Sequence, residues 1–342
     1  MHVRPIGAED APSLLELGAR PEVAELAEHV VTVPLEHWRG WIGEPDPDRV
    51  VTLGAFEGTA LLGAARLTIR SRRRQAHCGW LEVIVPPDGD AALDALLAQT
   101  NELCDRWLQV TRVRLRVPAE HPWDPDVLAR RGYVQEGVRR RAILRGGRLA
   151  DELQLARVDP SIVTANRGPS FALPPKGPPV RATFRAVRVE DGPATAAMYN
   201  DPLAAWGTLQ IPAQPRDTWT KRFATNDPLY FFVLVAEVEG TLAGTGAVIG
   251  ETSPRRRHSA GLGMAVAAPF QGRTVGRQLL DALVALSDQV GFARLELEVW
   301  TDNERARRIY EATGFEDEGV ARAGGFRDGA YVDDLAMARL RG

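Results

Sequence analysis

The feature that most constrains the fold of this chain is a repeat: segments of its first half reappear about 182 positions later. The matching pairs are Phe56–Ala65 with Val238–Ala247, Arg131–Val138 with Thr313–Val320, and Asp151–Val158 with Asp333–Leu340. Solenoid repeats have periods of roughly 20–50 residues, so a period this long, seen only twice, excludes a solenoid. It predicts the duplication of a whole domain of about 160 residues, which is a common domain size.

A proline-rich stretch separates the two copies. Residues 159–183 contain six prolines and two glycines. Prolines this dense can neither continue a helix nor donate to a strand ladder, so the stretch is predicted to be an extended linker. The predicted domains are therefore residues 1–158 and 184–342.

Within each copy, strand patterns alternate with helical ones. In the second copy, two apolar runs at 233–239 and 242–249 flank Gly240 and predict a hairpin. Four apolar residues then recur at helical spacing before a glycine at the expected C-cap: Leu279, Leu283, Leu286, Val290 and Gly291. Thr301–Glu304 fits a capping box that opens a further helix. The predicted fold class is α/β, with a mixed, mostly antiparallel sheet flanked by helices in each domain.

Composition narrows the functional classes. The net charge is −3, which implies no general attraction to nucleic acid or to an anionic membrane. Two cysteines, Cys78 and Cys104, are too few for a disulfide framework or a metal cluster. No signal segment is apparent at Met1–Ile6, and no apolar run approaches the roughly 18–20 residues of a membrane span. We expect a cytoplasmic protein without a metal that acts on a small molecule, either as a monomer or as a homodimer.

The stretch Val266–Phe315 carries the pattern with the clearest chemistry. It reads as a strand, a glycine-containing loop at Gln271–Gly276, a helix, a second strand and a second helix. The first turn of a helix has free backbone N–H groups, which bind anions, and a diphosphate is the favoured one here. The second helix and its end carry Asn303, Ala306, Tyr310 and the pair Gly314–Phe315. In order and spacing, the loop and these residues resemble the acetyl-coenzyme A site of the GNAT superfamily of N-acetyltransferases, and the whole chain resembles two tandem GNAT-like domains.

The resemblance implies which residues bind acetyl-coenzyme A. Loop N–H groups would hold the pyrophosphate, Arg273 and Arg277 would add positive charge, and Asn303 would contact the pantetheine arm. The implied set is Met264, Val266, Gln271, Gly272, Arg273, Thr274, Val275, Gly276, Arg277, Asn303 and Tyr310. Thr274 stands where the family pattern has glycine, and a β-branched residue adopts a positive φ only at a cost. We therefore expect Thr274 to adopt a helical φ, with its hydroxyl available to a phosphate.

By the same resemblance, Tyr310 lies beside the thioester sulfur and is the catalytic residue. Attack by an amine on the thioester expels a thiolate, which a phenol within hydrogen-bond reach can protonate. Taken alone, Tyr310 is better explained as a core ring with a satisfied hydroxyl. No general base is assigned, because Glu251, Glu296 and Glu298 are each better explained as exposed or structural carboxylates.

The first copy does not carry this pattern. Shifted by 182 positions, the key residues become Gly89 for Gln271, Asp90 for Gly272, Ala92 for Thr274, Asp94 for Gly276, His121 for Asn303 and Leu128 for Tyr310. Carboxylates repel a diphosphate, and leucine cannot protonate a thiolate. We expect the first domain to keep the fold without binding acetyl-coenzyme A productively.

The acceptor side is predicted from Trp206–Trp219 and Gly329–Arg339. Both segments resemble a bacterial subgroup of L-amino-acid N-acetyltransferases, which shares Thr-Leu-Gln-x-Pro and Tyr-Val-Asp elements. The implied acceptor-site residues are Thr208, Leu209 and Gln210, and the implied substrate is an amino acid or a related primary amine. The alternative is that Leu209, Ile211 and Trp219 are simply core residues.

Other functions remain open. An aminoglycoside acetyltransferase needs a carboxylate-rich groove for its cationic acceptor, and residues 208–214 contain no acid. A mycothiol synthase is another tandem relative, although nothing specifies a sugar-thiol acceptor. A GNAT-like sensor that binds an acyl-coenzyme A without catalysis is the alternative outside enzymes. Arginine triplets at 72–74, 139–141 and 255–257 are better explained as solvated hairpin ends than as a nucleic-acid site.

Overall fold

A computed structural model describes residues 1–342 except 30–31, 44–45, 47–48, 72 and 342. Contacts divide the chain into two compact units. Unit 1 comprises Met1–Thr164, Ser253–Arg255 and Gly319–Phe326, and unit 2 comprises Ala165–Thr252, Arg256–Glu318 and Arg327–Gly342. This division differs from the predicted boundaries, because two short segments of the second copy group with unit 1 and most of the linker groups with unit 2.

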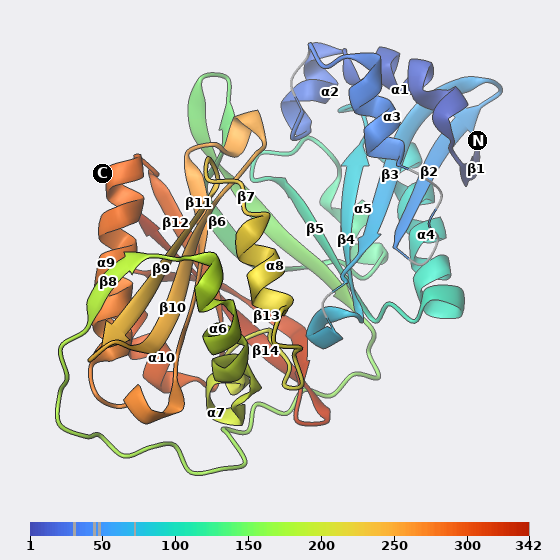
Figure 1. Ribbon diagram of the computed structural model, residues 1–342. Coiled ribbons are helices and arrows are strands. Elements are labelled where there is room, and N and C mark those ends of the chain that lie inside the picture. The colour runs from blue at the N-terminus through green and yellow to red at the C-terminus, as the bar shows by residue number, and fades with distance from the viewer. Residues whose placement is uncertain (30–31, 44–45, 47–48, 72, 342) are drawn as a thin grey trace. The chain divides into compact units, whose positions relative to one another are not determined.

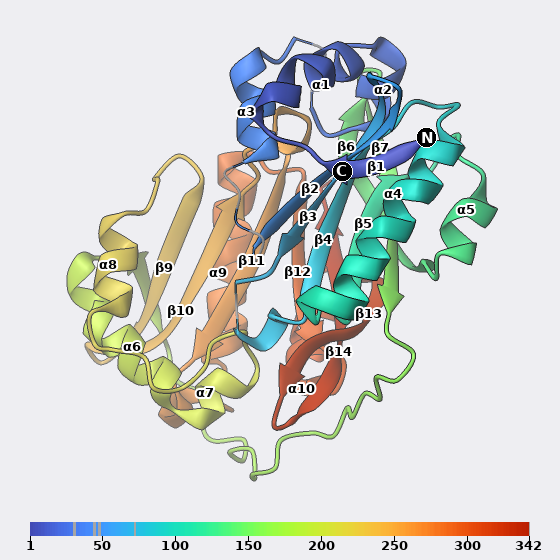
Figure 2. The same cartoon turned by 90° about the vertical axis from the view of Figure 1, so that its right-hand side faces the viewer.

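Unit 1 has an alternating order of strands and helices (Figure 1). Its elements are β1 (His2–Pro5), α1 (Ala11–Gly18), α2 (Pro21–Leu26), α3 (Leu35–Ile42), β2 (Val50–Glu57), β3 (Ala60–Ile69), β4 (Cys78–Ile84), α4 (Asp90–Leu103), β5 (Arg112–Pro118), α5 (Pro125–Arg130), β6 (Val134–Arg145) and β7 (Arg148–Val158). The strands lie in the order β1-β2-β3-β4-β5-β7-β6, and α4 packs against β1, β2 and β3 (Figure 2).

Unit 2 repeats this order. Its elements are β8 (Thr183–Ala186), α6 (Gly192–Asn200), α7 (Pro202–Trp206), α8 (Thr218–Ala224), β9 (Phe231–Val238), β10 (Thr241–Gly250), β11 (Ser259–Val266), α9 (Val275–Val290), β12 (Arg294–Trp300), α10 (Glu304–Glu311), β13 (Glu316–Arg327) and β14 (Ala330–Leu340). The strand order from β8 is β8-β9-β10-β11-β12-β14-β13, and residues Gly319–Phe326 of β13 belong to unit 1. The pairs β4–β5 and β11–β12 are parallel, whereas the other pairs described within each unit are antiparallel. Both units therefore have the mixed sheet that the sequence predicts.

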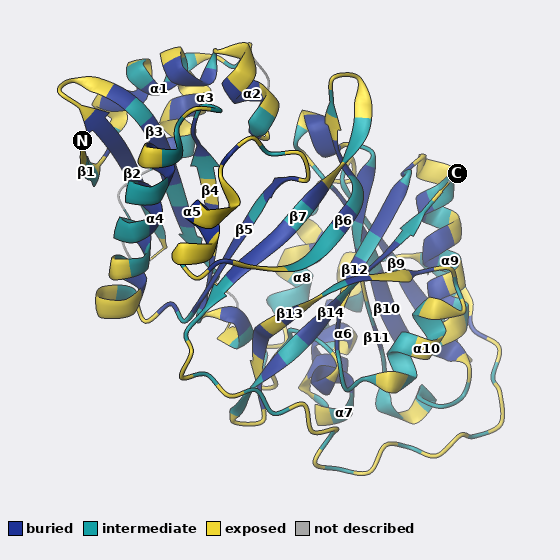
Figure 3. Cartoon of the chain, turned by 180° about the vertical axis from the view of Figure 1, so that it is seen from behind, coloured by how far each residue is buried: buried dark blue, intermediate teal, exposed yellow. Residues whose placement is uncertain are grey.

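Helices cover both faces of the unit 2 sheet. The core between α9 and the sheet holds Leu279 and Leu283, both fully buried, and α10 packs into the same cluster. Gly246 lets α9 approach, since a Cβ there would lie 2.4 Å from Leu283 Cδ1. On the opposite face, α6 and α8 form a smaller cluster with Ala265 of β11. Figure 3 shows the buried residues concentrated on the strands and on the inward faces of the helices. Within the described residues, no helix combines the length and apolar character needed to cross a membrane.

Two glycines lie where the sequence predicts the ends of elements. Gly240 turns the β9–β10 hairpin with a φ of 76°, and Gly291 ends α9 with a φ of 99°. The predicted capping box is wrong: α10 is capped by Asn303, whose side chain accepts a hydrogen bond from the Ala306 N–H. Asn303 lies one residue before α10 begins at Glu304, so it occupies the position at which a side-chain oxygen can reach the first helical turn.

The interpretation of the arginine triplets as solvated hairpin ends holds only in part: Arg73 and Arg257 are exposed, whereas other members are buried. Arg139 is buried and pairs with Glu152 at 3.0 Å, and Arg255 and Arg256 are buried as well. Arg72 lies outside the described residues. A guanidinium withdrawn from water needs a hydrogen-bonding partner, and β6 places Arg139 opposite Glu152 of β7.

A buried ion pair occurs at equivalent places in the two units. Arg112 binds Glu136 with N–O distances of 2.9 and 2.6 Å in unit 1. Arg294 binds Glu318 at 2.8 and 2.5 Å in unit 2. Both residues of one pair stand 182 positions from those of the other, so the repeat extends to buried polar contacts.

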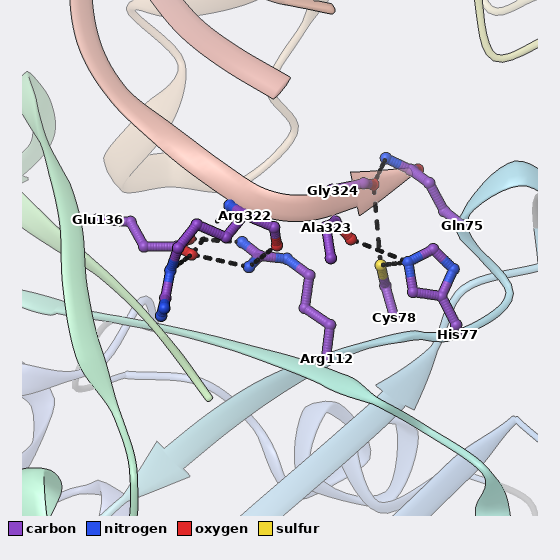
Figure 4. A network of polar contacts seen from close by, with 8 residues as sticks. All are labelled: Gln75, His77, Cys78, Arg112, Glu136, Arg322, Ala323 and Gly324. Carbon is purple, nitrogen blue, oxygen red and sulfur yellow. Dashed lines mark hydrogen bonds and ion pairs between the residues drawn. The ribbon is translucent and has the colours of Figure 1, made fainter. Parts of the chain in front are cut away.

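Residues Gly319–Phe326 of β13 complete the polar core of unit 1 (Figure 4). Arg112 donates to the Arg322 carbonyl at 2.6 Å, and the Arg322 N–H donates to Glu136 at 3.0 Å. His77 Nε2 lies 2.9 Å from the Ala323 carbonyl oxygen. Gln75 and Cys78 both donate to the Gly324 carbonyl. Buried donors of unit 1 therefore find their acceptors on a strand of the second copy.

Candidate active site

Part of β11 is unpaired on its β12 side. Among the described residues, the two strands pair over Ser259–Gly261 and Arg294–Glu296. Beyond that point β11 continues to Val266, and no described strand pairs with it there on the β12 side. Met264 and Val266 lie on this unpaired part of β11, both partly buried. An extended ligand can bond to the free edge of such a strand.

The predicted anion-binding loop joins β11 to α9. Gly272 has a φ of 75°, which suits a tight turn. Gly276 lies at the start of α9, where a Cβ would be 3.5 Å from Val266 Cγ2. Within the part of the chain that the structure describes, the N–H groups of residues 272–276 donate to no protein acceptor. Gln271 has a bracing role, since its Nε2 donates to the Val266 carbonyl at 3.0 Å. The loop thus presents free N–H groups at the start of α9, as an anion site requires.

Thr274 contradicts the expectation of a helical φ. Its φ is 69° and its ψ −7°, so it keeps the left-handed conformation of the glycine that it replaces. Its hydroxyl lies 2.6 Å from the Arg273 carbonyl and accepts from Gln278 Nε2 at 3.0 Å. The hydroxyl therefore serves contacts within the protein.

Positive charge near the loop comes partly from residues that sequence reasoning missed. Arg277 forms an ion pair with Asp281 at 2.9 Å, which offsets much of its charge. Arg305 of α10 reaches the loop instead: a Cβ on Gly272 would lie 2.6 Å from Arg305 Nη2 and 3.4 Å from the Lys176 Cα. The sequence pattern fixes the loop only locally, so it could not show which distant cations fold against it.

The helix α10 places the remaining family residues. Asn303 caps it, and a Cβ on Gly207 would lie 3.1 Å from Asn303 Nδ2, so the amide faces the predicted acceptor segment. Tyr310 packs in the same core cluster as Met264 and Val266, with its ring centroid 5.8 Å from that of Phe315. The structure therefore brings together the unpaired part of β11, the loop and the residues of α10.

Tyr310 is a neutral phenol at physiological pH. Burial raises its pKa to about 12. The residue itself is partly buried, among the apolar side chains of the core cluster. A phenol that keeps its proton can act as an acid toward a thiolate.

The predicted acceptor segment is a polar turn after α7. The Thr208 hydroxyl donates to the Ala205 carbonyl and accepts from the Gln210 N–H at 3.1 Å. Gln214, which the sequence did not single out, donates to Gln210 and accepts from Trp219 Nε1 at 2.6 Å. Leu209 is partly buried, but Ile211 is 42% exposed and is therefore not a core residue.

A buried guanidinium supports this segment. Arg327 stacks over Trp206, with its Cζ 4.2 Å from the ring centroid, and pairs with Asp302 at 2.5 Å. Trp300 Nε1 donates to the Trp206 carbonyl at 3.0 Å. These contacts fix the acceptor segment against the end of β12 and the start of α10.

The corresponding region of unit 1 has a shorter loop. Only residues 85–89 lie between β4 and α4, against 267–274 in unit 2. The N-cap of α4 is Gly89 and that of α9 is Thr274, so the constant shift of 182 used for the sequence comparison does not hold in the loop. Asp94 is held by Arg131 and Arg130, whose hydrogen bonds lower its pKa to about 2.

Comparisons with known proteins identify relatives of this chain among the acetyltransferases. The profile of the Acetyltransferase (GNAT) family matches residues 195–315. The L-amino acid N-acetyltransferase AaaT of Escherichia coli (strain K12) is 30% identical over 159 residues, which cover 46% of this chain and 97% of that protein. The uncharacterized N-acetyltransferase YycN of Bacillus subtilis (strain 168) is 36% identical over 52 residues, covering 15% of this chain and 33% of that protein. Among solved structures, the ribosomal-protein-alanine N-acetyltransferase from Brucella melitensis is 27% identical with a TM-score of 0.42, covering 46% of this chain and 99% of that one.

The fold and the site define an acyltransferase of the acetyl-coenzyme A-dependent type. The chain belongs to the GNAT family of acetyltransferases.

Proposed function

We propose that unit 2 transfers the acetyl group of acetyl-coenzyme A to the primary amine of a small molecule, an amino acid being the favoured class. The loop N–H groups suit the diphosphate of the cosubstrate, and the unpaired edge of β11 suits its extended arm. The observation that carries the proposal is the position of Tyr310 on α10, whose N-cap Asn303 lies beside Gly207 of the acceptor segment.

The reaction is direct attack within a ternary complex. The neutral amine nitrogen bonds to the thioester carbonyl carbon, and collapse of the adduct breaks the carbon–sulfur bond. The ammonium proton of the tetrahedral adduct passes to water, Tyr310 gives its proton to the departing thiolate, and the Tyr310 phenolate then regains a proton from solvent. The balance is one acetyl group moved and one thiol formed, with no change of oxidation state.

The acceptor class is inferred from the relative and from the segment after α7. AaaT carries the name of an L-amino acid N-acetyltransferase. In this chain, residues 208–214 offer hydroxyl and amide groups without a carboxylate, which favours a neutral or zwitterionic acceptor over a polycation. Thr208, Leu209 and Gln210 are the proposed acceptor-binding residues.

Thiol release from acetyl-coenzyme A tests the proposal. The purified full chain is assayed with amino acids, polyamines and aminoglycosides in parallel. Turnover with one or more amino acids, and little with the polycations, is expected. Cofactor binding without turnover on any amine would instead support the non-catalytic sensor.

A further inference from the structure

The proline-rich linker runs directly along the anion-binding loop of unit 2. Residues 165–182 belong to unit 2 and form an extended segment that leads into β8 (Figure 1). The Gly177 N–H donates to the Gly272 carbonyl at 3.1 Å, and the Val180 N–H donates to the Arg273 carbonyl at 3.2 Å. The linker thus binds the loop through two consecutive loop carbonyls.

These two bonds fix the direction of the loop N–H groups. In a trans peptide, the carbonyl of one residue and the N–H of the next lie in one plane and point in opposite directions. Carbonyls of Gly272 and Arg273 turned toward the linker therefore turn the N–H groups of Arg273 and Thr274 away from it. Those are the groups that the proposed function assigns to the phosphates.

A glutamine clamps the linker to α9. Gln278 Nε2 donates to the Val180 carbonyl at 2.8 Å, and Gln278 Oε1 accepts from the Ala182 N–H at 3.1 Å. The same side chain contacts the Thr274 hydroxyl. Gln278 therefore joins the linker, Thr274 and the first turns of α9.

The linker also brings a cation to the loop. The Lys176 Cα lies 3.4 Å from the Cβ position of Gly272, and Arg305 Nη2 lies 2.6 Å from the same position. Arg273 donates to the Pro178 carbonyl at 3.3 Å and Arg305 to the Pro174 carbonyl at 3.5 Å, and the structure records no carboxylate partner for either guanidinium or for Lys176 among the described residues. Uncompensated positive charge beside free N–H groups suits a polyanionic ligand.

We infer that the linker segment 174–180 is a positioning element of the cosubstrate site: it orients the loop N–H groups, and its Lys176 binds a phosphate of the nucleotide thioester. This inference rests on the proposed function of the loop. It assigns to the segment between the two copies a part in binding that a flexible tether would not have.

Gly177 allows the orienting bond to be removed singly. Gly177→Pro deletes the N–H that binds Gly272, whereas Gly177→Ala keeps it and serves as the matched control. We expect the KM for acetyl-coenzyme A to rise about fivefold or more in Gly177→Pro, with kcat within about twofold of the native value. A folded Gly177→Pro variant, judged by its Tm, with an unchanged KM would overturn the orienting role.

Lys176 is tested with two cosubstrates. Lys176→Met is compared with Lys176→Arg, using acetyl-coenzyme A and its 3′-dephospho analogue. A loss of affinity for both ligands places Lys176 on the diphosphate, and a loss only for acetyl-coenzyme A places it on the 3′-phosphate; Lys176→Arg should restore binding in either case. Equal affinity of the native and Lys176→Met proteins for both ligands would refute the role of Lys176.

Binding and turnover separate the two hypotheses. Calorimetric binding of coenzyme A reports on the linker even in a protein that acetylates none of the amines tried. Absence of turnover with intact, linker-dependent binding counts against the proposed acetylation alone. Native turnover with linker-independent binding counts against the linker alone.

Discussion

Thr274 has a φ of 69°, in a region that glycine enters readily and that a β-branched residue enters at a cost of about 1–3 kcal/mol. The surrounding contacts hold it there, since its hydroxyl meets Gln278 and the Arg273 carbonyl. The loop therefore keeps the geometry of the family pattern with a residue that opposes it. Local conformational preference is overridden by the contacts of the loop.

Replacing this residue should relieve the strain. Thr274→Gly is expected to raise the free energy of unfolding by about 1 kcal/mol, because the relief exceeds the extra chain entropy of glycine. Urea denaturation of the native and variant proteins measures the difference. Thr218→Gly, at the helical start of α8, is the control and should be destabilising. A variant at 274 less stable than the native protein would contradict the assignment of strain.

The pKa of Tyr310 is higher than that of an ordinary surface tyrosine, because the residue is withdrawn from water. Its raised pKa means that the folded protein favours the neutral phenol, so this contribution to stability is complete below about pH 10 and is lost as pH rises toward 12. Over the range in which an acceptor amine becomes deprotonated, the acid is still present. A phenol of unshifted pKa would begin to lose its proton in that range.

Tyr310→Phe should lower kcat by about 100-fold while the KM for acetyl-coenzyme A changes little, because the ring still fills its place and only the proton donor is gone. The native rate should rise with pH as the amine loses its proton, and should show no decline from Tyr310 below about pH 11. Steady-state kinetics across this range, with Phe315→Leu as a packing control, provides the check. A native-like kcat in Tyr310→Phe would remove the residue from the mechanism.

Strand β13 depends on a glycine where it meets β6. Gly319 pairs with Gly137 and has a φ of 152°. A Cβ on Gly319 would lie 2.3 Å from the Glu136 carbonyl oxygen and 2.5 Å from the Gly137 Cα. Both are backbone atoms, so the clash cannot be relieved by a side-chain rotation.

Gly319→Ala should therefore destabilise the protein by about 3 kcal/mol or more. Gly263→Ala is the matched control in another strand, since a Cβ there has no neighbour within 4 Å. Thermal and urea unfolding should show a large loss for the first variant and almost none for the second. Similar stability of the two variants would mean that β13 and β6 are not joined in this register.

The elements could be predicted where a local rule determines them. Gly240 and Gly291 were placed correctly, because a hairpin turn and a helix end each need a positive φ. The buried stripe of α9 was only half right: Leu279 and Leu283 are buried, but Val290 is 42% exposed. The exact face of a helix depends on the sheet beneath it, and Gly246 of β10 is part of that surface.

Contacts between distant segments could not be predicted in this way. The packing of the linker on the anion-binding loop and the place of Arg305 beside Gly272 have no periodic signal in the sequence. The family motif supplied the order of the site residues, including Asn303 and Tyr310. It did not supply the residues that hold the loop in shape.

Within the residues that the structure describes, only unit 2 combines unpaired loop N–H groups at the start of a long helix with a tyrosine at the position of Tyr310. In unit 1 the loop is shortened to residues 85–89, and Leu128 is buried at the position that corresponds to Tyr310. One cosubstrate site per chain is therefore the expected capacity of the duplicated protein.

Calorimetric titration of the full chain with coenzyme A should give a stoichiometry close to one per chain. Gly276→Asp, which puts a carboxylate in the first turn of α9, should abolish this binding through charge repulsion. Ala91→Asp, at an exposed position in the first turn of α4, is the matched control and should leave the stoichiometry unchanged. Two sites per chain, or binding that survives Gly276→Asp, would show that unit 1 also holds the ligand.

The strand segment Gly319–Phe326 has a consequence for how such a chain can be divided. It supplies the acceptors for Arg112, His77 and Gln75. A protein truncated after the first copy would therefore have buried donors without hydrogen-bond acceptors. A domain that no longer needs a cosubstrate of its own can persist because its neighbour has become part of its interior.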